Sequence, residues 1–244
     1  MLYTPVFMRV FVVLPAAGIG TRMAPGSAAP RSPKQFLSLG GTPILVHSLR
    51  AFAAVPRVSA IYVAVRRAEM GRVTALIAKH ELSSRVQVVE GGDSRQQSVS
   101  NALKSIQADE DDILLVHDAV RPLIDPATIE RTIDAASKHG AAIVGLPAVD
   151  TIKQVARTAD GAIITATIPR EYVVQAQTPQ GFRWQVLKRA FAEAEADGFV
   201  GTDEASLVER SGAEVAVVTG SPENLKITQP ADLELAEFYL RHRS

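Results

Sequence analysis

Five continuously apolar runs, separated by segments of helical pattern, constrain the fold of this chain more than any other feature of its sequence. The runs cover residues 10–14, 61–65, 86–89, 113–116 and 142–146. Strands that are buried on both faces have such runs, whereas a sheet with one solvated face alternates apolar and polar residues. The segments between the runs carry helix signals, such as Ser94 and Gln97 at capping-box spacing and Asp125 before Pro126. This alternation predicts an α/β fold with a doubly wound, mostly parallel sheet.

The pattern changes after residue 146. Residues 147–180 carry Thr, Ile and Val at strand-like spacing, with turn signals at Asp160-Gly161 and Pro169. We interpret this stretch as an antiparallel arm off the main sheet, with the arm proper at about 147–170. A helix is predicted again over residues 184–197, then a strand at 215–218 and a last helix from near Pro230. We expect one domain over residues 8–244 and an N-terminal extension over residues 1–7.

Composition excludes several classes of protein. Lys and Arg total 26 and Asp and Glu total 26, so the net charge is zero and a broad cationic surface for nucleic acid is excluded. The absence of cysteine excludes disulfides, thiolate metal sites and a cysteine nucleophile. No apolar run approaches the roughly 20 residues that a membrane span needs. We therefore expect no membrane segment and a cytoplasmic location.

A loop of small residues follows the first predicted strand and ends in a cation. It runs from Pro15 to Arg22, and Lys34 follows after a proline-rich stretch. Glycines in such a loop let backbone N–H groups approach phosphate oxygens. A dinucleotide fingerprint is excluded because Met23 stands at its third glycine and no acidic residue closes the strand that ends at Val65; no P-loop motif exists either. Two cations beside the loop indicate a nucleoside triphosphate; the alternative is a tight turn beside two solvated cations.

Polar residues also follow other predicted strands, at the edge where such sheets bind ligands. Asp118 follows the strand at 113–116 and could hold Mg²⁺, although a turn or cap is the alternative. Arg121 could equally form a surface ion pair. Backbone groups at Gly91-Gly92 could read the edge of a base, and the alternative is a cap built by Ser94.

Three further positions have mainly structural interpretations. His117 is interpreted as a structural histidine, and Thr202-Asp203-Glu204 is typical of a helix N-cap. Lys226 follows the last predicted strand in an apolar context, where a lysine needs an anionic partner more than on the surface.

The order of eight short strings is far more specific than any of them alone. They are PAAGIGTRM, PKQF, GGDSRQQSV, VHDAVRP, DTIK, QTPQGF, TDEASLVE and NLKIT. Together they closely resemble the 2-C-methyl-D-erythritol 4-phosphate cytidylyltransferase family, over almost the whole chain. The resemblance implies a Rossmann-like nucleotidyltransferase fold, dependence on Mg²⁺ or another divalent cation, and a homodimer built through the arm. It implies transfer from CTP to the sugar-alcohol phosphate, with release of pyrophosphate, in the non-mevalonate pathway to isoprenoids.

The resemblance also implies roles for individual residues. Those implied to act in catalysis are Arg22, Lys34, Arg170 and Lys226. Those implied to bind the nucleotide are Ala16, Ala17, Gly18, Gly92, Asp93, Ser98 and Asp118, the last also beside the metal. Those implied to bind the acceptor are Arg121, Thr151 and Thr178. Thr151 and Arg170, on the arm, are expected to reach the site of a partner subunit.

Two alternative functions stay open at this point. A ribitol 5-phosphate or other sugar-phosphate cytidylyltransferase would share the loop and the CTP site. A catalytically silent, dimeric nucleotide-binding module would keep the fold without the reaction. An NAD-dependent oxidoreductase is excluded by the same loop residues that exclude the dinucleotide fingerprint.

Overall fold

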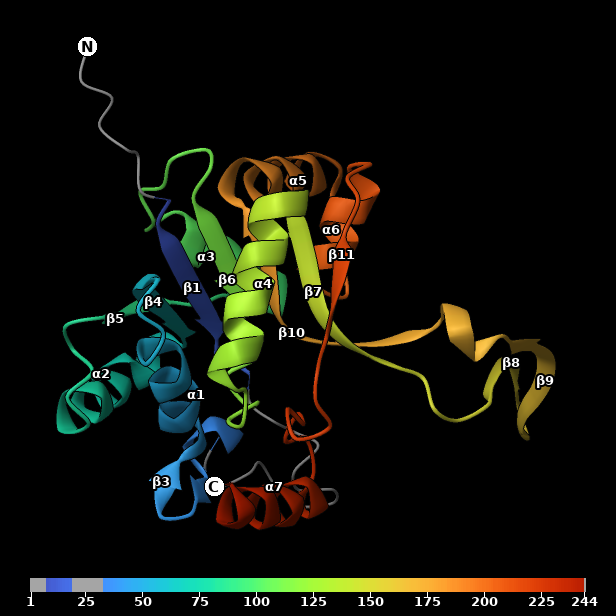
Figure 1. The fold of residues 1–244 in the computed structure, drawn as a ribbon, viewed down its shortest axis with the longest axis horizontal. Coiled ribbons are helices and arrows are strands. Elements are labelled where there is room, and N and C mark those ends of the chain that lie inside the picture. Colours follow the sequence, from blue (N-terminus) through green and yellow to red (C-terminus); the bar gives the residue numbers. More distant parts are fainter. Residues whose placement is uncertain (1–7, 19–32, 244) are drawn as a thin grey trace.

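The computed structural model describes residues 8–18 and 33–243, and its centre is a seven-stranded sheet (Figure 1). In the order β11-β7-β10-β6-β1-β4-β5, all neighbours are parallel except where β10 runs antiparallel to β6 and β7. The strands are β1 Val10–Pro15, β4 Val58–Val65, β5 Val86–Glu90, β6 Ile113–Val116, β7 Ala141–Pro147, β10 Val174–Arg183 and β11 Ala216–Thr219. The predicted mostly parallel α/β sheet is confirmed.

Helices cover both faces of this sheet. They are α1 Ile44–Ala53, α2 Met70–Lys79, α3 Arg95–Leu103, α4 Pro126–His139, α5 Trp184–Asp197 and α6 Glu204–Arg210; a further helix, α7 Pro230–His242, belongs to a separate apolar cluster. Apolar residues of α1, α2 and α4 pack on one face, and those of α3, α5 and α6 pack on the other. The predicted caps are present, since the side chains of Ser94 and Asp125 accept the N–H groups of Gln97 and Thr128.

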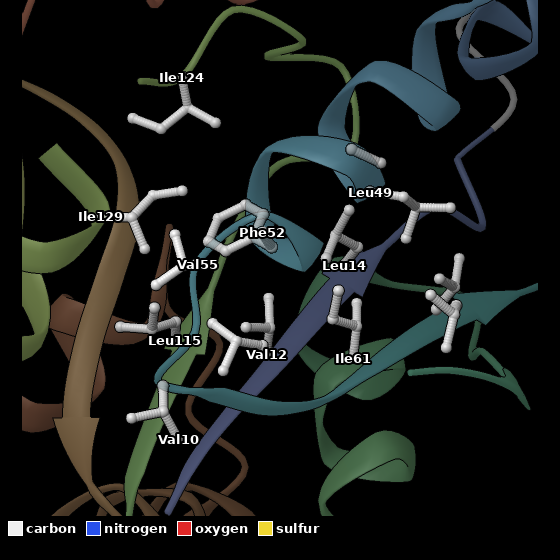
Figure 2. Packing of buried hydrophobic residues seen from close by; sticks show 14 of the residues in the cluster. Val10, Val12, Leu14, Leu49, Phe52, Val55, Ile61, Leu115, Ile124 and Ile129 are labelled. Atoms are coloured by element: carbon white, nitrogen blue, oxygen red, sulfur yellow. The ribbon is translucent and has the colours of Figure 1, made fainter. Parts of the chain in front are cut away.

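The first strand shows why its sequence is continuously apolar. Val12 and Leu14 lie in the cluster formed with α1, whereas Phe11 and Val13 lie in the cluster on the opposite face. Figure 2 shows Val12 and Leu14 beside Phe52 of α1. Burying a side chain of this size stabilises the fold by about 1.5–3 kcal/mol. Each position on the strand therefore contributes to a core, which leaves its carboxyl end as the place for polar chemistry.

The stretch interpreted as the arm divides into two parts. Strands β8 Ile152–Thr158 and β9 Gly161–Ile168 form a separate antiparallel pair that projects from the main sheet (Figure 1). This confirms an antiparallel arm. The prediction was wrong for residues 174–180, because β10 lies inside the main sheet. Two of its glutamines are buried and paired: Gln180 Nε2 donates to Asp203 Oδ2 at 2.7 Å, and Gln177 Nε2 donates to the Ser221 carbonyl at 3.0 Å.

Short elements complete the described chain. They are the 3-10 helices η2 Lys34–Phe36, η3 Arg67–Glu69 and η4 Arg170–Tyr172, and the strand pair β2 Ser38–Leu39 with β3 Thr42–Pro43. Helix α7 packs beside β2, where Leu39 and Ala236 share a small apolar cluster. Across the described ranges, none of the helices has both the length and the apolar character that crossing a bilayer requires.

Candidate active site

A cavity of about 320 Å³ opens at the carboxyl ends of the central strands. Nine of the predicted site residues line it: Ala16, Ala17, Gly18, Lys34, Gly92, Asp93, Ser98, Asp118 and Lys226. Arg121 and Thr178 are buried directly behind Asp118, which each of them contacts. Arg22 lies outside the described residues. The folded chain therefore brings together side chains that come from four separate strand ends.

The loop after β1 is held by side chains from elsewhere in the chain. Gln35 Nε2 donates to the Ala16 carbonyl at 2.7 Å, and Arg66 Nε donates to the Ala17 carbonyl at 2.8 Å. Gln35 is buried, so it fixes the start of η2 against the loop. The adjacent Lys34 is thereby placed at the cavity. The hydrogen bond of the Gln35 amide, rather than a strand of the main sheet, thus holds Lys34 in position.

The turn between β5 and α3 is shaped by Ser98. Its Oγ accepts the N–H of Gly92 at 3.0 Å and donates to the Ser94 carbonyl at 2.8 Å. Gly91 lies so close to the first loop that an added Cβ would come within 2.9 Å of the Ala17 Cβ. Asp93 stays exposed at the cavity wall. The N–H groups of Gly92 and Asp93 are already bonded to Ser98 Oγ and Gln97 Oε1, so what the turn can offer to the edge of a base is backbone carbonyls and the Asp93 carboxylate, all of them acceptors.

Asp118 lies at the centre of a network of five charged side chains. Its Oδ1 lies 3.2 Å from Arg95 Nε, and its Oδ2 lies 2.9 Å from Lys226 Nζ and 3.6 Å from Arg121 Nε. Arg95 Nη1 is in turn 2.7 and 2.6 Å from the two carboxylate oxygens of Glu204, which is 1% exposed. Burial alone would raise the pKa of Asp118, but the nearby charges of Arg95, Lys226 and Arg121 outweigh it and hold that pKa well below its ordinary value.

His117 and Thr178 hold the segment that carries Asp118. His117 Nε2 is 3.1 Å from the Arg121 carbonyl, which can only accept, so this nitrogen carries the proton. His117 Nδ1 then accepts from Thr178 Oγ1 at 3.0 Å, and the same hydroxyl oxygen accepts the N–H of Asp118 at 3.1 Å. Burial lowers the pKa of His117 to about 4. The structural interpretation of His117 agrees with this geometry. Thr178 donates its hydroxyl proton to His117, so in this arrangement that proton is not offered to a bound substrate.

The buried neutral His117 makes folding stability depend on pH. Its folded pKa lies below the ordinary 6.5, so as the pH falls the unfolded chain takes up the proton first and stability declines between about pH 6.5 and 4. We expect this residue to lower the free energy of unfolding by about 2–3 kcal/mol between pH 7 and 4.5. Urea titrations at both pH values test this. The loss should shrink in His117→Gln and persist in His139→Gln, a change at an exposed helix end; equal losses in both variants would contradict it.

Two predicted residues lie away from the cavity. Thr151 and Arg170 are exposed on the arm, and Arg170 Nη1 donates to the Val149 carbonyl at 2.7 Å. The arm carries them outward from the sheet (Figure 1). A single chain therefore does not bring these two side chains to the residues around Asp118.

The sequence interpretation missed three charged residues at the site. Arg66 and Arg95 line the cavity, and Glu204 lies behind Arg95. Arg95 stands in the string GGDSRQQSV and Glu204 in TDEASLVE; the sequence predicts no role for Arg95 and only a capping role for Glu204. Asp203 is indeed the N-cap of α6. One string carries an arginine and the other a glutamate, which could pair. That pairing can be predicted only once the two strings are known to lie side by side in the fold.

Comparisons with known proteins agree over nearly the whole chain. The family model for 2-C-methyl-D-erythritol 4-phosphate cytidylyltransferase (IspD) matches residues 10–242. Proteins of that name from Acidobacterium capsulatum and Solibacter usitatus are 72% and 53% identical, over 97% of this chain and 99% and 98% of theirs. The crystal structure of the enzyme of that name from Thermus thermophilus has a TM-score of 0.74 at 32% identity, covering 96% of this chain and 100% of the other. The chain belongs to the 2-C-methyl-D-erythritol 4-phosphate cytidylyltransferase family.

Proposed function

We propose that this protein transfers a cytidylyl group from CTP to 2-C-methyl-D-erythritol 4-phosphate, in the synthesis of isoprenoid precursors. The products are 4-diphosphocytidyl-2-C-methyl-D-erythritol and pyrophosphate. The observation that carries the proposal is the gathering of nine residues, to which the sequence resemblance assigns roles, around one cavity, with Lys34 and Lys226 both on its wall. Family membership supports the same activity.

The reaction places its main demand on charge. A phosphate oxygen of the acceptor attacks the α-phosphorus of CTP in line, a new P–O bond forms, and the bond to pyrophosphate breaks with its electron pair. The attacking oxygen is already an anion near neutral pH, so a strong base is unnecessary. Two anions must instead be held together, which makes positioning and charge stabilisation the main sources of catalysis. In this proposal Lys34 and Arg22 neutralise the triphosphate and Lys226 faces the acceptor phosphate, while Arg121 adds positive charge from its buried position behind Asp118.

The nucleotide is proposed to lie along the loop after β1. Ala16, Ala17 and Gly18 would line it, and Gly92 and Asp93 would read the cytosine. Asp93 would accept from the exocyclic amine of the base, which uracil lacks. Ser98 supports this arrangement by holding the Gly92 N–H.

A divalent cation fits the site only together with the triphosphate. Within residues 8–18 and 33–243, no three His, Asp or Glu side chains are grouped to hold a metal. Asp118 lines the cavity, and cations already lie beside both of its oxygens. Mg²⁺ commonly takes one or two carboxylates and draws its other ligands from substrate phosphates and water. Asp118 would be that carboxylate, and the bound ion would neutralise charge on the triphosphate.

This arrangement predicts metal binding that depends on the nucleotide. Without nucleotide, Mg²⁺ added to the protein in a calorimeter should give no saturable heat at millimolar concentration, because Asp118 is occupied by cations. With a non-hydrolysable CTP analogue present, saturable binding should appear. A stoichiometric Mg²⁺ site in the nucleotide-free protein would show that the protein itself supplies the ligands.

A second copy of the chain is proposed to complete the site. All residues of β9 are exposed, and Ile163 and Ile164 are 63% and 60% exposed. An isolated two-stranded hairpin is marginal in water, so an apolar arm of this kind needs a partner. A homodimer that covers the arm would place Thr151 and Arg170 at the other subunit's cavity.

A substrate contest tests the proposed reaction. Purified protein with Mg²⁺ is given methylerythritol phosphate or ribitol 5-phosphate, each with CTP, UTP, ATP or GTP, and pyrophosphate release is followed. We expect rapid release only with CTP and methylerythritol phosphate. A preference for ribitol phosphate would favour the pentitol enzyme, and use of UTP would contradict the role of Asp93. No release under any condition would favour the silent binding module.

A further inference from the structure

Glu204 is a buried acid that the proposed reaction does not use. It is the first residue of α6, directly after the N-cap Asp203. A glutamate at this position of a surface helix ordinarily points into water near the helix N-terminus. Here the residue is only 1% exposed, and both of its oxygens lie within 2.7 Å of Arg95 Nη1. A charge buried this deeply is retained only when it is paired, so its partner Arg95 defines what it does.

Arg95 divides its guanidinium between two carboxylates. Nη1 is taken by Glu204, and Nε donates to Asp118 Oδ1 at 3.2 Å. The second oxygen of Asp118 thereby faces Lys226, whose Nζ is 2.9 Å away, and Arg121, whose Nε is 3.6 Å away. The order along the network is Glu204, Arg95, Asp118 and Lys226, and Glu204 is its end farthest from the cavity.

The geometry of a guanidinium indicates what would happen without Glu204. The Nε and Nη2 groups point the same way and readily form two parallel hydrogen bonds with one carboxylate. If nothing held Nη1, this edge of Arg95 could close on both oxygens of Asp118. Asp118 Oδ2 would then turn from Lys226 towards Arg95, and the ammonium group would lose its fixed partner.

We propose that Glu204 is a positioning residue for cytidylyl transfer, because its hold on Arg95 leaves Asp118 Oδ2 free to fix the ammonium group of Lys226 at the cavity. This inference rests on the proposed function for its kinetic consequences. Its structural consequence, the Lys226 to Asp118 contact, is independent of the reaction.

The charges of the network agree with this role. Two carboxylates, Asp118 and Glu204, face three cations, Arg95, Arg121 and Lys226. Burial raises the pKa of Glu204 while the charge of Arg95 opposes that rise. Removing the negative charge of Glu204 leaves one more uncompensated positive charge beside the cavity. Anionic substrates would still be attracted, but Lys226 would no longer be held in one place.

The test compares Glu204→Gln with Glu209→Gln, an exposed glutamate on the same helix. We expect kcat to fall roughly 10- to 100-fold in Glu204→Gln, as expected for a misplaced reacting group. KM for CTP should stay level or fall, because the cavity gains positive charge. A fall in KM would separate this effect from partial unfolding, because loss of folded enzyme lowers the apparent kcat and leaves KM unchanged. Glu209→Gln should stay within about twofold of wild type. A folded Glu204→Gln protein with the kcat of Glu209→Gln would overturn the proposal.

Two further measurements keep the test decisive. If Glu204→Gln does not fold, Glu204→Asp is the second variant, because it keeps the negative charge on a side chain that is one methylene shorter. We expect it to lower kcat at least about fivefold, as for a misplaced group. An unchanged kcat overturns the proposal. A crystal structure of either variant should show Arg95 closer to both oxygens of Asp118 and Lys226 released. An intact Lys226 to Asp118 pair would overturn the proposal whatever the wild-type enzyme catalyses. Failure of the wild type in the substrate contest would instead overturn only the proposed function.

Discussion

Replacing Lys34 by alanine is expected to lower kcat by about 10²–10³, which corresponds to roughly 2.7–4 kcal/mol of transition-state stabilisation. Lys34 lies on the cavity wall at the start of η2, where the anchored Gln35 holds the backbone. A triphosphate in this cavity gains negative charge on its leaving group as the bond to the α-phosphorus breaks. An ammonium group that is already in place stabilises that charge without reorganisation, and alanine cannot replace it.

The same variant should fold normally. Lys34 is half-buried and does not belong to an apolar core cluster, and Gln35 would keep its bond to the Ala16 carbonyl. We expect Tm to change by less than about 3 °C, the shift that roughly 1 kcal/mol produces in a chain of this size. Lys188→Ala, at an exposed position of α5, is the matched control for loss of one lysine. A Lys34→Ala protein that turns over at the rate of this control would refute the role of Lys34.

Mixing two inactive variants should restore activity if the arm completes the partner's site. Arg170→Ala and Lys34→Ala each disable one contribution to the same proposed site, and we expect each alone to keep under about 1% of wild-type kcat. A mixed dimer has one site with an intact Lys34 and an intact Arg170 from the other subunit. Random exchange in a twofold dimer makes half of the dimers mixed with one good site each, so activity should recover to about one quarter of wild type.

The measurement is made after refolding or slow exchange of equal amounts of the two proteins, with each variant treated alone as its control. The recovered rate should depend on the mixing ratio and be highest near equal amounts. No recovery, together with mass spectrometry that confirms mixed dimers, would mean that Arg170 does not act across subunits. Mixing Lys34→Ala with Lys226→Ala is a second control, since both changes lie in one chain's cavity and no mixed dimer has a complete site.

The sequence by itself determined the layers of this fold and one edge of its site. Continuous apolar runs such as residues 10–14 predict strands buried on both faces, because each side chain must find a core. Ser94 and Asp125 predict helix starts, because their hydrogen bonds reach only three residues along the chain. Lys34, Asp118 and Lys226 follow strands or their loops, and the carboxyl ends of the parallel strands meet at one edge of a sheet. Local chemistry was sufficient for each of these predictions.

Only the tertiary structure decided which polar residues are buried and which site each completes. The place of β10 in the main sheet was missed because glutamines are typical of exposed segments; Gln177 and Gln180 become core residues only because Ser221 and Asp203 supply partners. Glu204 and Arg95 are 109 residues apart, and neither carries a local sign that it is paired. The arm places Arg170 away from the cavity that the loop residues form. The physical reason is common to all three: burying a polar or charged group is favourable only when a distant partner satisfies it, and that pairing belongs to the folded chain rather than to any short segment.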